Sequence, residues 1–244
     1  KALQDGRPHK KVKAWDIIEA FAEGRWETGR LYCHNLTASN AHTPFVDEIK
    51  QSNLCEEIFL PTKPYDDHFD LWTKSRSNGE TAFCSIAALN VANIAPEEYF
   101  EVALRAVRTV NKMIDRAPML APSMKESILR RRSLGIGITG LASAIYKEGL
   151  DYDGSEESLE FVEDIAELHY YSLLKASIQM SEETGFAVEG IKKNWLPIDT
   201  MKSTRAPKLD WEKLRGKPRY NSVLVAHMPT ESSAMFSNAT NGLY

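Results

Sequence analysis

One stretch of the sequence reads Gln51-Ser52-Asn53-Leu54-Cys55-Glu56-Glu57-Ile58, with an amide, a thiol and a carboxylate at alternate positions. Successive side chains of an extended segment point to opposite sides, so we expect Asn53, Cys55 and Glu57 to face the same way. A hydrogen-bonding amide, a sulfur and a base would then share one small volume. A thiol in this setting can act as a thiolate nucleophile, or can carry a radical if another protein removes its hydrogen. The alternative is a buried cysteine that packs as a small hydrophobic side chain.

A second stretch lies near the C-terminus, where Asn221-Ser222-Val223-Leu224-Val225-Ala226-His227-Met228 runs into Pro229-Thr230-Glu231-Ser232-Ser233-Ala234-Met235. This pattern predicts a strand, a hydroxyl-rich turn and the start of a helix. Free N–H groups and the positive end of the helix dipole favour an anionic oxygen there, and Thr230, Ser232 and Ser233 add hydroxyl donors. The pattern therefore suits a phosphate group, although an ordinary helix N-cap uses the same residue types.

Together the two stretches resemble the large, catalytic subunit of class I ribonucleoside-diphosphate reductase. Further matching stretches occur in the same order and touch most of the chain: Leu60-Pro61-Thr62-Lys63-Pro64, Arg131-Arg132-Ser133-Leu134-Gly135-Ile136-Gly137, Leu196-Pro197-Ile198-Asp199-Thr200 and Ser237-Asn238-Ala239-Thr240-Asn241-Gly242. The resemblance implies an α/β fold, as part of a ten-stranded α/β barrel in which a central loop carries the active-site cysteine. Helices that alternate with short apolar strands agree with an α/β class.

The resemblance also implies roles for the first stretch. Cys55 would become a thiyl radical and take the 3′ hydrogen from the ribose, which opens the way to loss of the 2′ hydroxyl. Glu57 would be the base at the 3′ hydroxyl, and Asn53 would orient the substrate by hydrogen bonding. Leu54 and Glu56 would complete the substrate contacts. A carboxylate that works as a base should be shielded from water, because burial brings its pKa toward neutrality.

Two further sets of residues receive roles from the resemblance. The substrate diphosphate would be held by Pro229, Thr230, Glu231, Ser232 and Ser233. Cys84 lies in the apolar run 81–90, which predicts a buried strand, where simple core packing is the alternative. By resemblance Cys84 would be one of two cysteines that supply reducing electrons and end as a disulfide. Its partner is not found in this chain, and Cys33 receives no role.

The resemblance places the chain in a larger assembly. Residues 1–244 would be a partial catalytic barrel domain that lacks its N-terminal and C-terminal portions and is inactive alone. The expected partners are the remaining portion of the large subunit, a radical-generating, metal-containing small subunit and a ribonucleoside diphosphate substrate. The chain itself would bind no cofactor, and thioredoxin or glutaredoxin would be the reductant. Two alternatives stay open, a non-catalytic structural or assembly fragment and part of a cobalamin-dependent ribonucleotide reductase.

Composition limits the location and the binding partners of the chain. Its 244 residues are 43% hydrophobic, which suffices for a substantial core. A formal net charge of -4 argues against binding a nucleic acid polymer. Apolar runs stay well short of the roughly 20 residues that span a bilayer. Three cysteines without a CxxC pair, and no secretory signal, favour a reducing cytoplasm.

Spacing of apolar residues predicts two helices. One is opened by Pro96 and carries apolar positions from Phe100 to Ile114 at intervals of three and four. The other is expected from about Glu156 to Glu183, after a turn and cap signal. The charge-rich and proline-rich segment 192–218 is expected at the surface.

Three other patterns are expected to carry no chemistry. The run Gly135-Ile136-Gly137-Ile138-Thr139-Gly140 matches the dinucleotide-binding pattern, but a helix end or turn is expected before it, where that fingerprint needs a strand. Its glycines are expected to permit close helix packing. Tyr170 and Tyr171 precede the phosphate stretch, unlike the radical-relay tyrosines of the resembling family, and are interpreted as packing residues. His34 and His42 lack spaced partners, so no metal site is expected.

Overall fold

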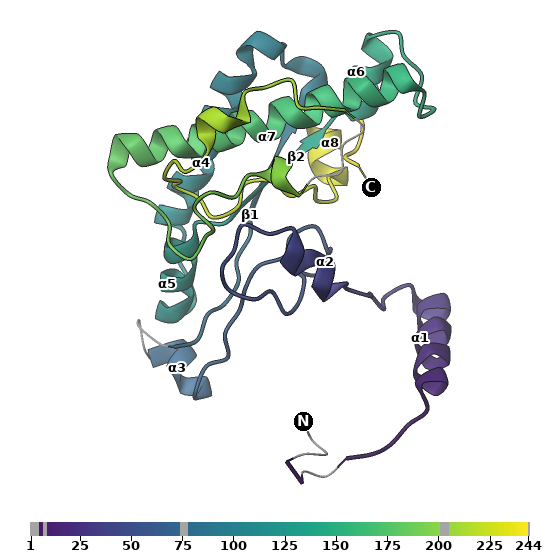
Figure 1. The fold of residues 1–244 in the computed structure, drawn as a ribbon, viewed down its shortest axis with the longest axis vertical. Helices are drawn as coiled ribbons and strands as arrows, with labels where there is room; N and C mark the ends of the chain where they lie inside the picture. Colours follow the sequence, from purple (N-terminus) through teal and green to yellow (C-terminus); the bar gives the residue numbers. More distant parts are fainter. Residues whose placement is uncertain (1–4, 7–8, 74–77, 201–204, 244) are drawn as a thin grey trace. The chain divides into compact units, whose positions relative to one another are not determined.

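The computed structural model describes residues 5–6, 9–73, 78–200 and 205–243 (Figure 1). The chain divides into two compact units, residues 1–35 and residues 36–244. The first unit contains the helix α1, Ala14–Thr28, which ends at Gly29 in the left-handed conformation (φ 64°). Glycine adopts this conformation without a steric penalty, so the helix ends where its sequence favours an end. The second unit contains every residue of the candidate site.

A parallel pair of strands, β1 (Ser85–Asn90) and β2 (Leu134–Thr139), forms the sheet of the second unit. The extended segment 221–228 joins the other edge of β2 through backbone hydrogen bonds of 3.0 and 2.8 Å. The predicted strand at 221–228 is therefore extended backbone beside β2 and not a regular strand. The α/β class is confirmed. Among the described residues, however, the sheet has two strands and is not closed, so the expected barrel strands are not seen.

Both long predicted helices are confirmed (Figure 1). They are α4, Tyr99–Arg116, which follows a 3-10 turn at Pro96–Glu98, and α7, Glu156–Thr184. The shorter helices are α2 (Leu36–Ala41), α3 (His68–Thr73), α5 (Pro122–Arg131), α6 (Leu141–Lys147) and α8 (Glu231–Phe236), with 3-10 turns at Val91–Asn93, Pro197–Asp199 and Trp211–Leu214. None of the described helices is both long and apolar enough to span a bilayer.

The main hydrophobic core joins α4 and α7 to β2. Its most buried side chains include Val107 and Ile114 of α4, Leu173 of α7, and Leu134 and Ile136 of β2, each 0–1% exposed. All six residues of β2 are buried, which makes this strand the centre of the unit. The apolar spacing of α4 therefore predicted the correct core face.

The glycines of the 135–140 run have a different role from the one expected. Gly135 and Gly137 lie inside β2 and not between helices. A Cβ atom on Gly135 would lie 2.6 Å from Cys84 Sγ, and one on Gly137 would lie 2.6 Å from the Ala226 carbonyl oxygen. The glycines thus let Cys84 and the segment 221–228 press against β2. The prediction of close helix packing is wrong because the run itself forms the strand, and for the same reason it does not follow a strand as a dinucleotide fingerprint does.

The segment 192–218 lies mostly at the surface, as expected, but a few of its side chains cover part of the core. Leu196, Trp211 and Leu214 are buried, while residues 201–204 lie outside the described residues. Tyr170 and Tyr171 of α7 meet the Trp211 ring edge-on, with centroid distances of 6.1 and 5.3 Å. The interpretation of these tyrosines as packing residues is confirmed.

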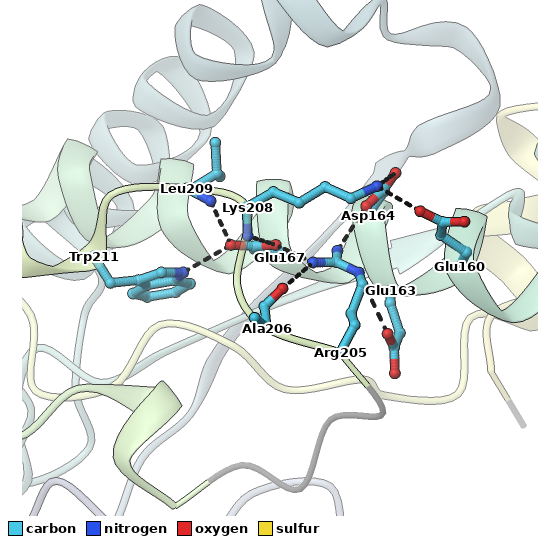
Figure 2. A network of polar contacts seen from close by, with 9 residues as sticks. All are labelled: Glu160, Glu163, Asp164, Glu167, Arg205, Ala206, Lys208, Leu209 and Trp211. Carbon is cyan, nitrogen blue, oxygen red and sulfur yellow. Dashed lines mark hydrogen bonds and ion pairs between the residues drawn. The ribbon is translucent and has the colours of Figure 1, made fainter.

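A buried carboxylate on α7 fixes this segment to the helix (Figure 2). Glu167 accepts hydrogen bonds from the backbone N–H groups of Lys208 at 3.1 Å and Leu209 at 2.8 Å, and from the Trp211 indole at 3.0 Å. Arg205 donates to the same carboxylate at 3.0 Å and also pairs with Asp164 at 2.6 Å. Because the carboxylate is only 9% exposed, these contacts are shielded from solvent.

Candidate functional site

The Asn53 to Ile58 stretch folds as a turn and not as an extended segment. Asn53 N–H donates to the Ile58 carbonyl at 3.3 Å, and Ile58 N–H donates back to Asn53 Oδ1 at 3.2 Å. Glu56 takes a left-handed conformation with φ 56°. An asparagine side chain that bonds nearby backbone competes with extended structure. The prediction that Asn53, Cys55 and Glu57 share one face through strand alternation is therefore wrong.

The turn lies between two cavities of about 360 Å³ each. Asn53 and Cys84 line the first cavity, together with Thr81. Glu57 lines the second, and Ile58 lines both. Cys55 is exposed at the tip of the turn and lines neither cavity. The structure therefore brings Asn53 to Cys84 and places Glu57 on the other side of the turn.

Glu57 nevertheless acts electrostatically on Cys84. Burial, as the larger cause, and the negative charge of Glu57 together raise the pKa of the Cys84 thiol to about 12. Cys84 is thus a protonated thiol at neutral pH. Its sulfur packs in a small apolar cluster that includes Ile58, Leu60 and Ala226.

One oxygen of the half-buried Glu57 carboxylate is shielded from solvent. This Oε2 atom is buried and has no hydrogen-bond partner among the described residues. The Trp195 Nε1–H donor, in the lining of the same cavity, is also buried and unpartnered among those residues. Buried polar atoms without partners are rare, so these two atoms set this part of the chain apart from the ordinary core.

The Pro229 to Ser233 stretch forms the start of α8, as predicted. Glu231, Ser232 and Ser233 are exposed there, but Thr230 is buried. The Thr230 hydroxyl donates to Asn241 Oδ1 at 2.6 Å. The expectation that this hydroxyl donates to a phosphate is therefore wrong. Sequence reasoning had not assigned Asn241 a separate role, although the Asn-Gly pair at 241–242 is a turn signal.

The two parts of the predicted site lie at opposite ends of the sheet. Cys84 directly precedes β1, whereas Thr139, the last residue of β2, donates to the carbonyl of Thr240 at 2.7 Å beside the Thr230 turn. The strands are parallel and six residues long, so these ends are separated by roughly 20 Å along the strand direction. The described residues contain no group of three or more His, Cys, Asp or Glu side chains arranged to hold a metal ion.

Known proteins resemble this chain along nearly its whole length. The family model described as "Ribonucleotide reductase, barrel domain" matches residues 2–244. Ribonucleoside-diphosphate reductase subunit alpha of Haemophilus influenzae is 39% identical over 253 residues, which cover 96% of this chain and 32% of that protein. Ribonucleoside-diphosphate reductase 1 subunit alpha of Escherichia coli is 37% identical, again over 96% of this chain and 32% of the relative. The large subunit from Caenorhabditis elegans is 30% identical over 94% of this chain and 29% of its own length. The chain spans about a third of the length of the curated relatives it matches.

Proposed function

Because this chain belongs to the ribonucleotide reductase barrel-domain family, we propose that it carries the active site for reducing ribonucleoside diphosphates to deoxyribonucleoside diphosphates. Family membership, with Asn53, Cys55 and Glu57 present on one turn beside Cys84, is the observation that carries the proposal. Residues 1–244 would form part of the catalytic barrel domain of a large subunit.

Each residue of the turn has a proposed step. The exposed Cys55 thiol is accessible to radical transfer, and as a thiyl radical it takes the 3′ hydrogen of the ribose. Glu57 accepts the proton of the 3′ hydroxyl, a role that suits its buried oxygen. Asn53 uses its Oδ1 to close the turn, so its amide NH2 group is the part that orients the substrate. Leu54 and Glu56, on the same turn, complete the substrate contacts.

Cys84 and the α8 turn complete the proposed chemistry. Cys84, held as a protonated thiol, gives its proton to the 2′ hydroxyl, which leaves as water. Cys84 and a cysteine of the remaining portion together lose two electrons and two protons and end as a disulfide, and Cys55 returns the hydrogen to C3′. Pro229, Thr230, Glu231, Ser232 and Ser233 hold the diphosphate. There the exposed Ser232 and the backbone N–H groups are the donors, because Thr230 is bonded to Asn241. One substrate molecule must contact both sites, with its ribose at Cys55 and its diphosphate at the start of α8. The Cys55 turn therefore has to reach toward the α8 end of the sheet.

The proposed enzyme needs further components. They are the remaining portion of the large subunit, a metal-containing small subunit that supplies the radical, and thioredoxin or glutaredoxin as reductant. Support comes from the names of the relatives, which are alpha or large subunits, and from the third of their length that this chain spans. The low cysteine content suits a reducing cytoplasm.

The test is formation of deoxyribonucleoside diphosphate by this chain combined with the remaining portion and a small subunit. Turnover is expected in the full mixture and is expected to be abolished by Cys55→Ser. The matched control is Cys33→Ser, which changes the other exposed cysteine and should leave turnover intact. Turnover that survives Cys55→Ser would overturn the assignment.

A further inference from the structure

The segment 47–63, called here the Cys55 loop, is held at its ends more firmly than at its tip. Leu54, beside Cys55, is 82% exposed. At the tip, Asn53 bonds within its own turn, with donor to acceptor distances of 3.2 to 3.3 Å. Bonds within the turn fix its shape but not its place on the protein. The position of the Cys55 thiol therefore depends on how the rest of the loop is held, by the buried side chains of Ile49, Ile58 and Leu60 and by polar contacts at its two ends.

One guanidinium, that of Arg131, connects those two ends. Its Nη2 donates to Asp47 Oδ2 at 2.5 Å, at the start of the loop. Its Nε and Nη2 donate to the two carboxylate oxygens of Glu80 at 2.6 and 3.0 Å. Glu80 in turn exchanges two backbone hydrogen bonds, of 2.9 and 3.1 Å, with Lys63 at the end of the loop. Lys63 Nζ also forms an ion pair with Asp47 Oδ1 at 3.2 Å, which links the two ends of the loop directly.

The surroundings of Arg131 leave it little freedom. Arg131 is 8% exposed and Glu80 is 2% exposed. The guanidinium lies 5.6 Å from the centre of the Phe45 ring, and a Cβ atom on Gly190 would come within 2.5 Å of Nη1. A planar fork that binds one carboxylate with two bonds fixes direction as well as distance, which a lysine ammonium does not.

Arg131 also ties the loop to the sheet. It is the last residue of α5 and lies three positions before β2 begins at Leu134. β2 is the fully buried strand against which Cys84 packs. A shift of Arg131 relative to the loop is therefore also a shift of Cys55 relative to Cys84.

We propose that Arg131 is a positioning residue, which sets the place of the Cys55 thiol by joining both ends of the Cys55 loop to β2. It acts through Asp47 and Glu80 and touches no substrate. For catalysis the inference rests on the proposed function of Cys55, whereas the geometry of the loop is a property of the chain itself. Misplacement of a reacting group by about 1 Å can cost on the order of 100-fold in rate.

A distance measurement tests the positioning directly in the complete chain. Nitroxide labels are placed at Cys55 and, through Lys112→Cys, on the exposed side of α4, after Cys33 and Cys84 are changed to serine. Double electron–electron resonance should give a narrow distribution of label distances in this parent. Arg131→Lys and Asp47→Asn should each broaden it.

A control variant and a second test variant allow the distance measurement to confirm or overturn the proposal. Arg108→Lys changes a matched guanidinium, which binds the half-exposed Glu183 with bonds of 2.7 and 2.8 Å, and should leave the distribution unchanged. If Arg131→Lys fails to fold by circular dichroism, Asp47→Asn decides, because Asp47 is only partly buried and Glu80 keeps its pairing. A folded Asp47→Asn chain with the parent distribution would overturn the proposal.

Turnover gives the second readout, in the reconstituted complex. Arg131→Lys should lower kcat on the order of 10- to 100-fold while the KM for the ribonucleoside diphosphate changes little, because Arg131 does not contact substrate. Arg108→Lys should change neither constant. An unchanged kcat in Arg131→Lys would contradict the proposal. If the unmodified complex shows no turnover, the proposed function fails, and the distance measurement still decides the role of Arg131.

Discussion

Cys84 and Gly135 pack so closely that a Cβ atom on the glycine would lie 2.6 Å from the cysteine sulfur. The same atom would lie 3.0 Å from Ala226 Cβ, so there is little room for a side chain at position 135 of β2. A side chain at this position has to move the thiol, the strand or the neighbouring segment.

Gly135→Ala is therefore expected to destabilise the chain by about 1–3 kcal/mol, the usual cost of overpacking a core. The free energy of unfolding from urea titration measures the effect. The double change Gly135→Ala with Cys84→Ala removes the sulfur and should recover part of the loss. If Gly135→Ala and the parent chain have the same free energy of unfolding, the neighbours of position 135 can make room for a methyl group without loss of stability.

The reactivity of Cys84 should reflect its raised pKa. With a pKa of about 12, roughly one thiol in ten thousand is ionised at pH 8. Iodoacetamide at that pH should therefore modify the exposed Cys33 and Cys55 well before Cys84, as followed by mass spectrometry of peptides. Labelling of all three at similar rates would contradict the shielding of Cys84.

Removal of the Glu57 charge should lower the pKa of Cys84. A nearby negative charge disfavours the thiolate, so Glu57→Gln should shift the pH profile of Cys84 alkylation to lower pH. Glu56→Gln removes a neighbouring carboxylate that does not contribute to the pKa shift of Cys84, and should leave the profile in place. A larger shift of the alkylation profile in Glu56→Gln than in Glu57→Gln would mean that Glu57 points away from the thiol.

Glu167 should stabilise the chain in a pH-dependent way. Burial raises its pKa, but hydrogen bonds from the N–H groups of Leu209 and Lys208, the Trp211 indole and Arg205 together outweigh burial and hold the pKa below its usual value. The stabilisation is thus present at neutral pH and is lost as the pH falls through the lowered pKa. Glu167→Gln should cost about 2 kcal/mol at pH 7, measured by urea unfolding, and much less near pH 3.

The control for this prediction is Glu160→Gln. Glu160 is more than half exposed and pairs with Lys208 Nζ at 2.9 Å, so its removal should cost well under about 1 kcal/mol. A Glu167→Gln penalty as small as that of Glu160→Gln would mean that the segment 205–211 does not depend on the buried carboxylate.

His169 should make the fold sensitive to mild acid. Its Nε2–H donates to the Ile136 carbonyl at 2.9 Å, so Nδ1 is the acceptor for the Tyr99 hydroxyl at 2.9 Å. Burial lowers the pKa of His169 to about 4. The unfolded chain therefore binds more protons between about pH 6.5 and pH 4, and His169 contributes a loss of stability of up to about 1.4 kcal/mol per pH unit across that window.

The measurement is the free energy of unfolding at pH 7 and pH 5. His169→Gln should reduce its pH dependence, whereas the exposed His68→Gln should not. Nitrogen NMR should also show His169 in its neutral form at pH 5. A charged imidazole at that pH in the folded chain would contradict the assignment.

Features that repeat locally along the chain could be predicted from the sequence. The spacing of apolar residues gave α4 and α7 nearly to their ends, because a helix face repeats every three to four residues whatever lies opposite it. The packing role of Tyr170 and Tyr171 was inferred from their order along the chain, because they precede the phosphate stretch. Motifs in a fixed order were also enough to indicate the family, which the comparisons bear out.

Features that depend on distant partners were decided by the tertiary structure alone. The Asn53 side chain closes a turn where strand alternation was expected, and the glycines of β2 make room for Cys84 instead of for a helix. Arg131 meets Asp47 across 84 positions of sequence, and the Thr230 hydroxyl donates a hydrogen bond to Asn241 Oδ1. Periodicity and propensity describe neighbours along the chain, whereas these contacts arise only once the sheet and the core bring remote segments together.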